Sequence, residues 1–342
     1  MSYWWYVPFV SGTSFFLTAA LRRYALSQSL MDIPNERSSH SIPTPRGGGV
    51  AIVITFLLSL SVLFGVEKLA LSDFLGVALG GMFIAGIGFL DDHGHIAARW
   101  RLFAHFLASA WVLFWLGGLP PIVMFGFNFG VSWLGYLIAA FYLVWMLNLY
   151  NFMDGIDGLA SVEAICVCLG ACFLYWTAGA DELVVGPLLL AASVAGFLCW
   201  NFPPAKIFMG DAGSGFLGII LGALSLQAAW TNPLFLWGWL ILLGVFIVDA
   251  TFTLARRLLR GDKVYEAHRS HAYQFAARQV GRHLPVTMVI AAINVFWLLP
   301  IALCVGRFGL NGVLGVILAY VPLIGLAIKF HAGELDVHTV KD

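Results

Sequence analysis

Long apolar runs recur along almost the whole chain, and they restrict its fold more than any other feature of the sequence. A helix needs at least ~17 apolar residues to cross the hydrocarbon core of a bilayer. The chain has about eleven candidate stretches of this kind, with no polar block between them large enough to fold separately. The stretches are Trp4–Leu21, Gly48–Val66, Phe74–Leu90, Leu102–Leu116, Trp133–Tyr150, Leu159–Thr177, Leu183–Trp200, Phe216–Trp230, Leu234–Leu254, Val286–Val305 and Val313–Ile328.

The composition points to the same fold class. Of the 342 residues, 61% are hydrophobic and 11% are charged, whereas soluble domains carry roughly 25% charged residues. We therefore predict an all-α integral membrane protein, a polytopic bundle of about eleven transmembrane helices in a single membrane domain that covers residues 1–342. The first apolar stretch has no basic segment before it and no small-residue cleavage site after it, so we expect it to be retained as a span.

The basic residues predict the orientation of the bundle. Alternate threading of the eleven stretches places every Lys and Arg except Lys68 and Arg307 on one side. The positive-inside rule assigns that side to the cytoplasm, which puts the N-terminus in the periplasm and the C-terminus in the cytoplasm. The formal net charge is zero, which gives no reason to expect a nucleic-acid partner. The five cysteines all lie in apolar runs, where a thiol acts as a small hydrophobic group.

Most unusual polar clusters fall in five of the predicted cytoplasmic loops. These loops comprise residues 27–47, 91–101, 148–158, 201–215 and 256–283. Ionisable groups near membrane depth are costly to keep and therefore indicate function. We predict that the active site lies on these loops and faces the cytoplasm, while the periplasmic connections only join helices.

The first loop combines positive charge with a glycine triplet. Arg37, His40 and Arg46 supply the charge, and Gly47–Gly49 open the next apolar stretch. Glycines let backbone N–H groups approach an anion closely, which favours an anion-binding role. The alternative is a plain loop between two helices.

The second loop begins with two adjacent carboxylates at the end of an apolar stretch, Asp91 and Asp92. Adjacent acids repel each other unless a cation or a hydrogen-bond donor is near. An acid at the C-terminus of a helix also opposes the macrodipole, which argues against a merely solvated helix end. Arg99, Arg101 and His105 follow, and we expect them to reach a lipid phosphate.

The third loop carries two amides and two carboxylates at a regular spacing of three residues: Asn148, Asn151, Asp154 and Asp157. On a helix this spacing places successive groups on one face. Amide and carboxylate oxygens suit a hard cation such as Mg2+. We expect the glycines that follow each aspartate to break the helix here.

The last two loops add further charged groups. Asp211 precedes Gly213–Gly215, whose N–H groups at a helix start are suited to phosphate. Asp249 lies near the inner end of its stretch and is followed by a cationic segment that contains His268–His271. Glu163 is the one acid clearly inside an apolar stretch, and we expect it to lie close enough to the third loop to join it.

Together these motifs resemble those of a known enzyme family. Asp91-Asp92, then Asn148-Leu-Tyr-Asn-Phe-Met-Asp-Gly-Ile-Asp-Gly-Leu159, then Phe208-Met-Gly-Asp-Ala-Gly-Ser214 occur in a chain of about eleven spans. This order is similar to that of the polyprenyl-phosphate N-acetylhexosamine-1-phosphate transferases, and the form Asn35-Glu-Arg-Ser-Ser-His40 in the first loop resembles their O-antigen-initiating subgroup. The resemblance extends over most of the chain.

The resemblance implies a bacterial inner-membrane enzyme that moves N-acetylhexosamine 1-phosphate from a UDP-sugar to undecaprenyl phosphate and releases UMP. It implies Mg2+, with Mn2+ as the alternative ion, and it implies membrane lipids around the protein. The expected product starts an O-antigen or a capsule chain. N-acetylfucosamine, N-acetylquinovosamine and N-acetylglucosamine are the candidate sugars.

The family's functional residues map onto the same loops. The implied metal ligands are Asn151 and Asp211. The paired aspartates Asp91 and Asp92 are expected to orient or deprotonate the lipid phosphate. The predicted catalytic residues are Asp91, Asp92, Asp154 and Asp157, and the predicted substrate-binding residues are Arg37, His40, Arg99, Arg101, Asn148, Arg269 and His271.

The chain departs from the family pattern at several positions, and two alternative functions stay open. His268 stands in place of an acid, Tyr273 and Gln274 stand where relatives have further histidines, and Ser38 stands where a lysine is common. These departures bear on the sugar rather than on the reaction. A secondary transporter and an enzyme of the cell-wall lipid precursor are the competing functions. The oligomeric state is open, a homodimer included.

Overall fold

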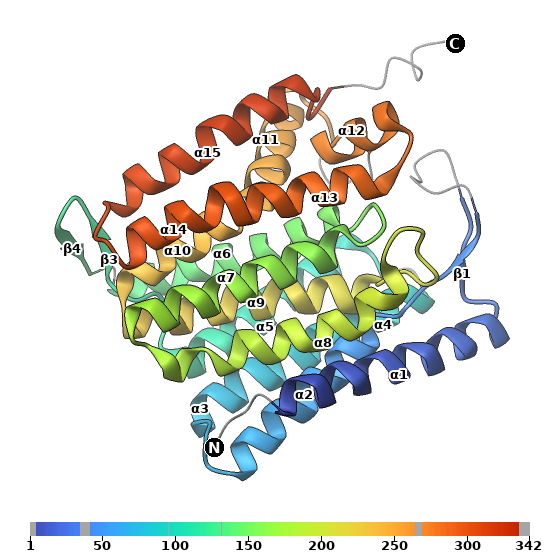
Figure 1. The fold of residues 1–342 in the computed structure, drawn as a ribbon, viewed down its shortest axis with the longest axis horizontal. Helices are drawn as coiled ribbons and strands as arrows, with labels where there is room; N and C mark the ends of the chain where they lie inside the picture. Colours follow the sequence, from blue (N-terminus) through green and yellow to red (C-terminus); the bar gives the residue numbers. More distant parts are fainter. Residues whose placement is uncertain (1–4, 35–41, 95, 131, 264–268, 335–342) are drawn as a thin grey trace.

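The protein is a bundle of helices that run side by side (Figure 1). The computed structural model describes residues 5–34, 42–94, 96–130, 132–263 and 269–334. Apolar surroundings force each backbone N–H and C=O to find a partner within its own segment, which favours helices. The α-helices are α1 (Tyr6–Ser27), α2 (Val50–Gly65), α3 (Leu71–Phe74), α4 (Gly80–His93), α5 (Ala98–Leu116), α6 (Ser132–Met153), α7 (Leu159–Ala178), α8 (Val185–Asn201), α9 (Asp211–Thr231), α10 (Pro233–Leu242), α11 (Gly244–Arg260), α12 (Ala272–Val280), α13 (His283–Ile293), α14 (Leu299–Gly306) and α15 (Gly312–Lys329).

Short non-α turns join some of these helices. The π-helical turn η2 (Leu75–Leu79) connects α3 to α4, and a second one, η4 (Asn294–Leu298), connects α13 to α14. The 3-10 turn η3 (Asp181–Leu183) precedes α8. Each of the eleven apolar stretches corresponds to one of these helices or to a pair joined end to end.

The helices confirm the predicted all-α membrane fold. Within the part of the chain that the structure describes, seven helices are long and apolar enough to cross a membrane, or eight if a bent pair counts as one span. The bent pair is α10 and α11, whose axes differ by 70°. The total of eleven spans and the orientation of the termini stay predictions.

Helix α9 lies at the centre of the bundle. In the most apolar 18 residues of α9, 94% is buried inside the protein. The helix packs against α4 and α6. A Cβ added at Gly218 would lie 2.6 Å from the backbone oxygen of Met146, so α6 and α9 approach too closely there for any side chain. Small residues at such crossings allow the backbone contact that holds membrane helices together.

Two short antiparallel hairpins were not predicted. Strand β1 (Met31–Asp32) pairs with β2 (Thr44–Pro45), and β3 (Ile122–Met124) pairs with β4 (Phe127–Phe129). The first hairpin brackets the first predicted loop, and its residues 35–41 lie outside the described ranges. Strand β2 of this hairpin leads directly to Gly47–Gly49, which contact the fourth loop.

The glycine triplet has a different role from the predicted one. The N–H groups of Gly48 and Gly49 donate to the backbone oxygens of Phe208 and Met209, both at 2.9 Å. A Cβ at Gly49 would lie 2.5 Å from the Cα of Gly213. These two N–H groups are therefore used to join two loops, and the expectation that they bind an anion is wrong.

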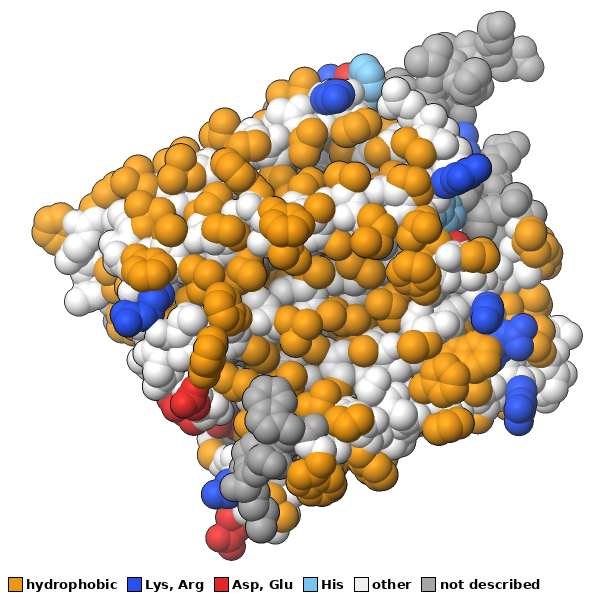
Figure 2. Space-filling view, viewed as in Figure 1, with side chains coloured by type: hydrophobic (Ala, Val, Ile, Leu, Met, Phe, Trp, Pro, Cys, Tyr) orange, Lys and Arg blue, Asp and Glu red, His pale blue; other side chains and the backbone are white. Residues whose placement is uncertain are grey.

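The outer surface agrees with a lipid environment. Figure 2 shows hydrophobic side chains over the middle of the visible face, with Lys and Arg gathered toward the two ends of the bundle. Large apolar side chains such as Phe16, Phe114 and Phe296 are more than 70% exposed, which would be unfavourable in water. The predicted active-site loops meet at one end, on the right in Figure 1.

Candidate active site

The site is organised around the start of α9. The carboxylate of Asp92, in the last turn of α4, accepts the N–H groups of Asp211 at 2.9 Å and of Ala212 at 3.2 Å. A carboxylate at a helix N-terminus is stabilised both by these bonds and by the macrodipole. The two helices approach so closely that a Cβ at Gly88 would lie 2.5 Å from the backbone of Asp211. Asp92 thus fixes where Asp211 points.

Two arginines neutralise the carboxylates around this helix start. Arg46 binds Asp92 through Nε at 2.9 Å and Asp211 through Nη2 at 2.5 Å. Arg101 binds Asp91 through Nη1 at 2.5 Å, and the same atom lies 3.6 Å from Asp211. We call Asp91, Asp92, Asp211, Arg46 and Arg101 the carboxylate–arginine cluster. Both arginine side chains are 37% exposed, so an anionic substrate can reach them.

Asp91 is further held by the loop that follows it. Its Oδ1 accepts the N–H of Ile96 at 2.8 Å, while Oδ2 takes Arg101. The predicted repulsion between Asp91 and Asp92 is thus relieved by separate partners for each carboxylate. Arg99, in contrast, is exposed with its guanidinium 5.9 Å from the ring of Trp100, and no ion pair joins it to a carboxylate among the residues described.

Negative charge exceeds positive charge near the cluster. Removal from water raises the pKa of the Asp154 carboxyl well above its ordinary value, and Asp211 and Asp92 raise it further. Burial works to lower the pKa of Arg46, but the carboxylates outweigh it and the pKa of Arg46 lies above its ordinary value. Both directions indicate a site that would gain from an added cation.

The third loop divides between a helix and a turn. Asn148 and Asn151 lie in α6, which ends at Met153, whereas Asp154 and Asp157 lie beyond its end. The prediction of four groups on one helix face is therefore wrong for the two acids, although the break at the glycines is confirmed. The Asn151 amide donates to Ser214 Oγ at 3.2 Å in α9, and the Asn148 amide donates to the backbone oxygen of Val144 at 2.7 Å.

Asp157 joins three segments. Its Oδ2 accepts the N–H of Ala205 at 3.1 Å, and its Oδ1 lies 3.2 Å from Nδ1 of His283 at the start of α13. Thr287 donates to the backbone oxygen of Asp157 at 3.1 Å. These contacts fix the position of the loop between α6 and α7.

A second capped helix lies beside the cluster. Asp249 in α11 accepts the N–H groups of Ala272 at 3.0 Å and Tyr273 at 3.1 Å, at the start of α12. Its Oδ1 also lies 3.1 Å from Nδ1 of His271, which is buried. This contact orients the imidazole of His271. Arg269 precedes this helix, and its backbone oxygen accepts a hydrogen bond from Arg278.

The departures at Tyr273 and Gln274 have a structural explanation. Tyr273 donates its hydroxyl to the backbone oxygen of Phe152 at 2.9 Å, and the Gln274 side chain accepts the N–H of His271 at 3.2 Å. A Cβ at Gly155 would overlap the Tyr273 hydroxyl. Tyr273 therefore fastens α12 to the third loop, whereas Gln274 caps the start of α12.

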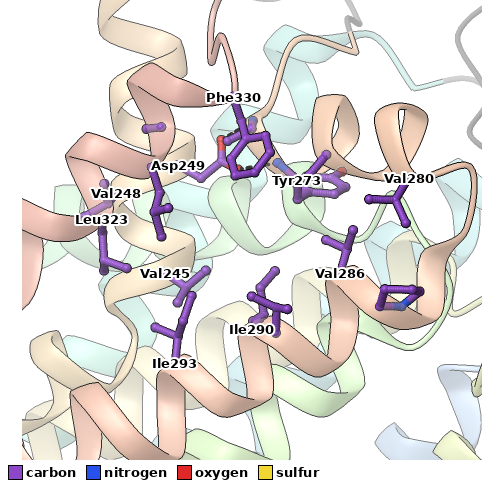
Figure 3. A pocket seen from close by; sticks show the side chains of 16 residues that line it. Val245, Val248, Asp249, Tyr273, Val280, Val286, Ile290, Ile293, Leu323 and Phe330 are labelled. Carbon is purple, nitrogen blue, oxygen red and sulfur yellow. Dashed lines mark hydrogen bonds between the residues drawn. The ribbon is translucent and has the colours of Figure 1, made fainter.

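An apolar pocket of about 200 Å³ adjoins the Asp249–Tyr273 contact. It lies between α11, α12, α13 and α15, and Figure 3 shows Asp249, Tyr273 and Phe330 close together, with Val245, Ile290 and Ile293 opposite. Apart from Asp249 and the hydroxyl of Tyr273, the labelled side chains of the pocket are hydrocarbon. It suits an apolar chain better than a sugar.

Three predictions on these loops need correction or lie outside the described residues. The N–H groups of Gly213 and Ser214 both donate to the backbone oxygen of Gly210 at 3.1 Å, so they do not serve a phosphate. Glu163 does not join the third loop, because its carboxyl receives a hydrogen bond from the side chain of Asn294. Arg37 and His40 fall outside the described ranges.

Sequence reasoning missed part of what the site contains. Arg46 was expected only to add positive charge, yet it bridges Asp92 and Asp211. His283 is the last residue of the fifth predicted loop, but nothing in the sequence indicated its contact with Asp157. Tyr273 departs from the family pattern, which marked it as unusual, but the sequence did not indicate its contact with Phe152.

The donor set fits a divalent cation in chemistry and charge. Asp91, Asp92, Asp154 and Asp211 supply four carboxyl groups near two guanidinium groups, and oxygen ligands are those that Mg2+ prefers. Among the residues described, however, no three His, Cys, Asp or Glu side chains converge as a metal site. In this arrangement the carboxylates converge on Arg46 and Arg101 instead.

Known proteins resemble this chain over much of its length. The model of "Glycosyl transferase family 4" matches residues 74–229. A probable undecaprenyl-phosphate N-acetylglucosaminyl 1-phosphate transferase of Bacillus subtilis is 31% identical over 76% of this chain and 73% of its own. An undecaprenyl-phosphate alpha-N-acetylglucosaminyl 1-phosphate transferase of Thermotoga maritima is 27% identical over 84% of this chain and 87% of its own. A phospho-N-acetylmuramoyl-pentapeptide-transferase of Moorella thermoacetica is 33% identical over 61% of this chain and 69% of its own.

Proposed function

The chain belongs to glycosyl transferase family 4, the polyprenyl-phosphate N-acetylhexosamine-1-phosphate transferases, and from this premise we propose its reaction. The lipid phosphate of undecaprenyl phosphate attacks the sugar-bearing phosphorus of a UDP-N-acetylhexosamine. The bond between the two phosphates breaks, UMP leaves, and the sugar 1-phosphate stays on the lipid. The carboxylate–arginine cluster is the observation that supports this most, because both substrates are phosphate anions.

The chemistry needs charge control more than a strong base. A phosphate monoester has a second pKa near ~6, so the lipid phosphate is mostly ionised at neutral pH. The obstacle is repulsion between this anion and a diphosphate. Arg46 and Arg101 are partly exposed and can turn from the carboxylates toward phosphate oxygens.

We propose Mg2+, or Mn2+, as the cation, with Asn151 and Asp211 as its ligands. The ion would supply positive charge that stabilises the negative charge of the reacting phosphates. Asp92 would hold Asp211 in place, and Asn151 is already fixed through Ser214. His271 and Arg269 would bind phosphate oxygens from the side of α12.

The surroundings support a lipid acceptor taken from the membrane. The apolar pocket beside Asp249 and Tyr273 is suited to part of a polyprenyl chain. We propose that the protein spans a bacterial inner membrane about eleven times, with its N-terminus in the periplasm and this site in the cytoplasm. The product would begin an O-antigen or a capsule chain, with N-acetylfucosamine, N-acetylquinovosamine or N-acetylglucosamine as its first sugar.

The test is UMP release by purified protein in detergent, with undecaprenyl phosphate, Mg2+ and a panel of UDP-N-acetylhexosamines. Release should need lipid and metal, stop with EDTA, and occur with one donor above the others. Absence of release with every donor would overturn the proposal and favour a transporter.

Variants then separate the roles within the cluster. Asp211→Ala and Asn151→Ala should raise the Mg2+ concentration that gives half-maximal rate. Asp91→Ala should lower turnover at an unchanged Mg2+ requirement. An unchanged Mg2+ titration in Asp211→Ala would exclude Asp211 as a ligand.

A further inference from the structure

A carboxyl group lies fully buried in the bundle, apart from the carboxylate–arginine cluster. Glu163 in α7 is 0% exposed, and its Oε2 accepts a hydrogen bond of 2.5 Å from Nδ2 of Asn294, which is 3% exposed and begins the π-helical turn η4. A buried charge is retained at high cost unless it is paired. Among the residues described, no Lys, Arg or His forms an ion pair with Glu163.

Each of the two side chains has one oxygen without a partner. The second carboxyl oxygen of Glu163, Oε1, and the amide oxygen of Asn294, Oδ1, are both buried and accept no hydrogen bond from the described part of the chain. A buried acceptor left unsatisfied costs about 1–3 kcal/mol. One additional proton would satisfy both, because a carboxylic acid donates through its O–H while its other oxygen accepts.

The pair lies at one end of a polar stripe that runs along α13 to the first residue of η4. His283, Thr287 and Asn294 follow one another at spacings of four and seven residues, which places them on one face of this continuous helical segment. That face packs against α7. At the other end of the stripe, Thr287 donates to the backbone oxygen of Asp157, and His283 contacts its carboxylate. Glu163 and Asp157 are thus both fixed by one helix.

We propose that Glu163 is a neutral carboxylic acid that forms a cyclic, doubly hydrogen-bonded pair with the Asn294 amide, and that this pair positions Asp157 by setting the register of α13 against α7. Glu163 is a positioning residue, since it touches no substrate. Without the pair, α13 can shift along or rotate on α7, which moves His283 and Thr287 away from Asp157. For its activity readout this rests on the transferase function proposed above.

Substitutions distinguish a neutral acid from a required charge. Glu163→Gln replaces the acid by an amide that can both donate and accept, so the cyclic pair with Asn294 persists. We expect it to keep turnover within about threefold of the native protein, whereas Glu163→Leu and Asn294→Leu each lose about tenfold or more, with the loss mainly in kcat. Ser225→Ala is the matched control, because it removes a different buried hydroxyl contact, that with Tyr142, away from the site.

Three readouts make the result decisive. The melting temperature in detergent should fall for both leucine variants and for Ser225→Ala. Only the two leucine variants should also lose turnover per folded molecule. The infrared difference between the native protein and Glu163→Gln should contain the C=O band of a protonated carboxyl. This band and the unfolding data do not depend on the substrate, so they test the pair even if the transferase activity is absent.

Loss of turnover in Glu163→Gln equal to that in Glu163→Leu would overturn the proposal, because it would show that the ionised carboxylate is required. A carboxylate band in place of the protonated one would do the same. If the leucine variants lose stability but keep full turnover, the pair holds the helices together without positioning Asp157, and that half of the proposal fails.

Discussion

Asp92 and Asp249 do the same structural work in different surroundings. Asp92 accepts the first two N–H groups of α9, and Asp249 accepts the first two of α12, each from a neighbouring helix. Asp92 also binds Arg46, in the midst of further carboxylates. Asp249 instead contacts His271 and the hydroxyl of Thr253, beside an apolar pocket.

The difference indicates what each cap is for. Around Asp92 the capped helix begins with Asp211, a proposed metal ligand, so an error in the cap is passed directly to the phosphates. Around Asp249 the cap orients the imidazole of His271 and also Tyr273, which holds the third loop. The oxygens of Asp92 are taken by two N–H groups and Arg46, which favours a positioning role over the predicted role as a base.

The largest expected effect is at the charged cap. Asp92→Asn keeps the shape of the side chain but places an NH2 group against an N–H donor or against the guanidinium of Arg46. We expect turnover to fall by about a hundredfold or more, as for a broken buried charge pair. UMP release per folded molecule measures this, with circular dichroism to verify the helices. Turnover within tenfold of native would mean that the cap on α9 is dispensable.

The cap at Asp249 should matter less. Asp249→Asn loses one N–H acceptor and the contact with His271, whereas Asp92→Asn also disturbs the ion pair with Arg46. We expect a loss of about tenfold in turnover, with the Mg2+ requirement unchanged because Asp211 keeps its place. Should Asp249→Asn prove as severe as Asp92→Asn, the surrounding charge would not explain the difference between the caps.

The sequence predicted the fold class and the loops that gather around the start of α9, for a physical reason, while the roles of the site residues stay predictions. Apolar runs of membrane length dictate helices, and the order of the motifs at helix ends dictates that they meet at one end of the bundle. Asp91, Asp92 and Asp211 therefore came together as predicted. What could not be predicted depends on packing across helices, such as Asp92 on the start of α9.

Glycine patterns were the weakest guide. Gly48 and Gly49 have the composition of a phosphate loop, yet their N–H groups serve backbone oxygens of another loop. Sequence cannot distinguish a glycine that admits a ligand from one that admits a neighbouring chain. Glu163 shows the same limit for charge, because only the structure reveals that its partner is Asn294.

The surplus of negative charge near Asp92 predicts that one substitution, Asp154→Asn, raises the stability of the protein although it lowers turnover. The pKa of Asp154 is raised by burial and by nearby carboxylates, so the folded state holds its proton more tightly than the unfolded state does. Stability is then lost as pH rises above the ordinary range of an aspartate. Without metal at neutral pH, Asp154→Asn should therefore raise the melting temperature, by roughly 2–4 °C, while it reduces turnover.

Asp249→Asn is the control for this stability prediction, since no such surplus surrounds it, and it should melt lower than the native protein. Replacing EDTA by Mg2+ should raise the melting temperature of the native protein more than it raises that of the Asp154→Asn variant. A melting temperature of Asp154→Asn that falls in EDTA would show that the carboxyl is ionised and paired in the fold.

The smallest expected effect concerns how the second cap reaches the third loop. Tyr273→Phe removes only the hydroxyl that donates to the backbone oxygen of Phe152, a bond of about 1 kcal/mol. We expect the KM for the UDP-sugar to rise about threefold with kcat nearly unchanged, since the loop loses one hydrogen bond but keeps the contacts of Asp157.

Gly155→Ala should be more severe, because its Cβ would overlap that hydroxyl and push α12 away. In the double variant the missing hydroxyl makes room for the methyl group, so partial rescue is expected. Strictly additive losses would mean that the two residues act separately and that α12 does not hold the loop through this contact.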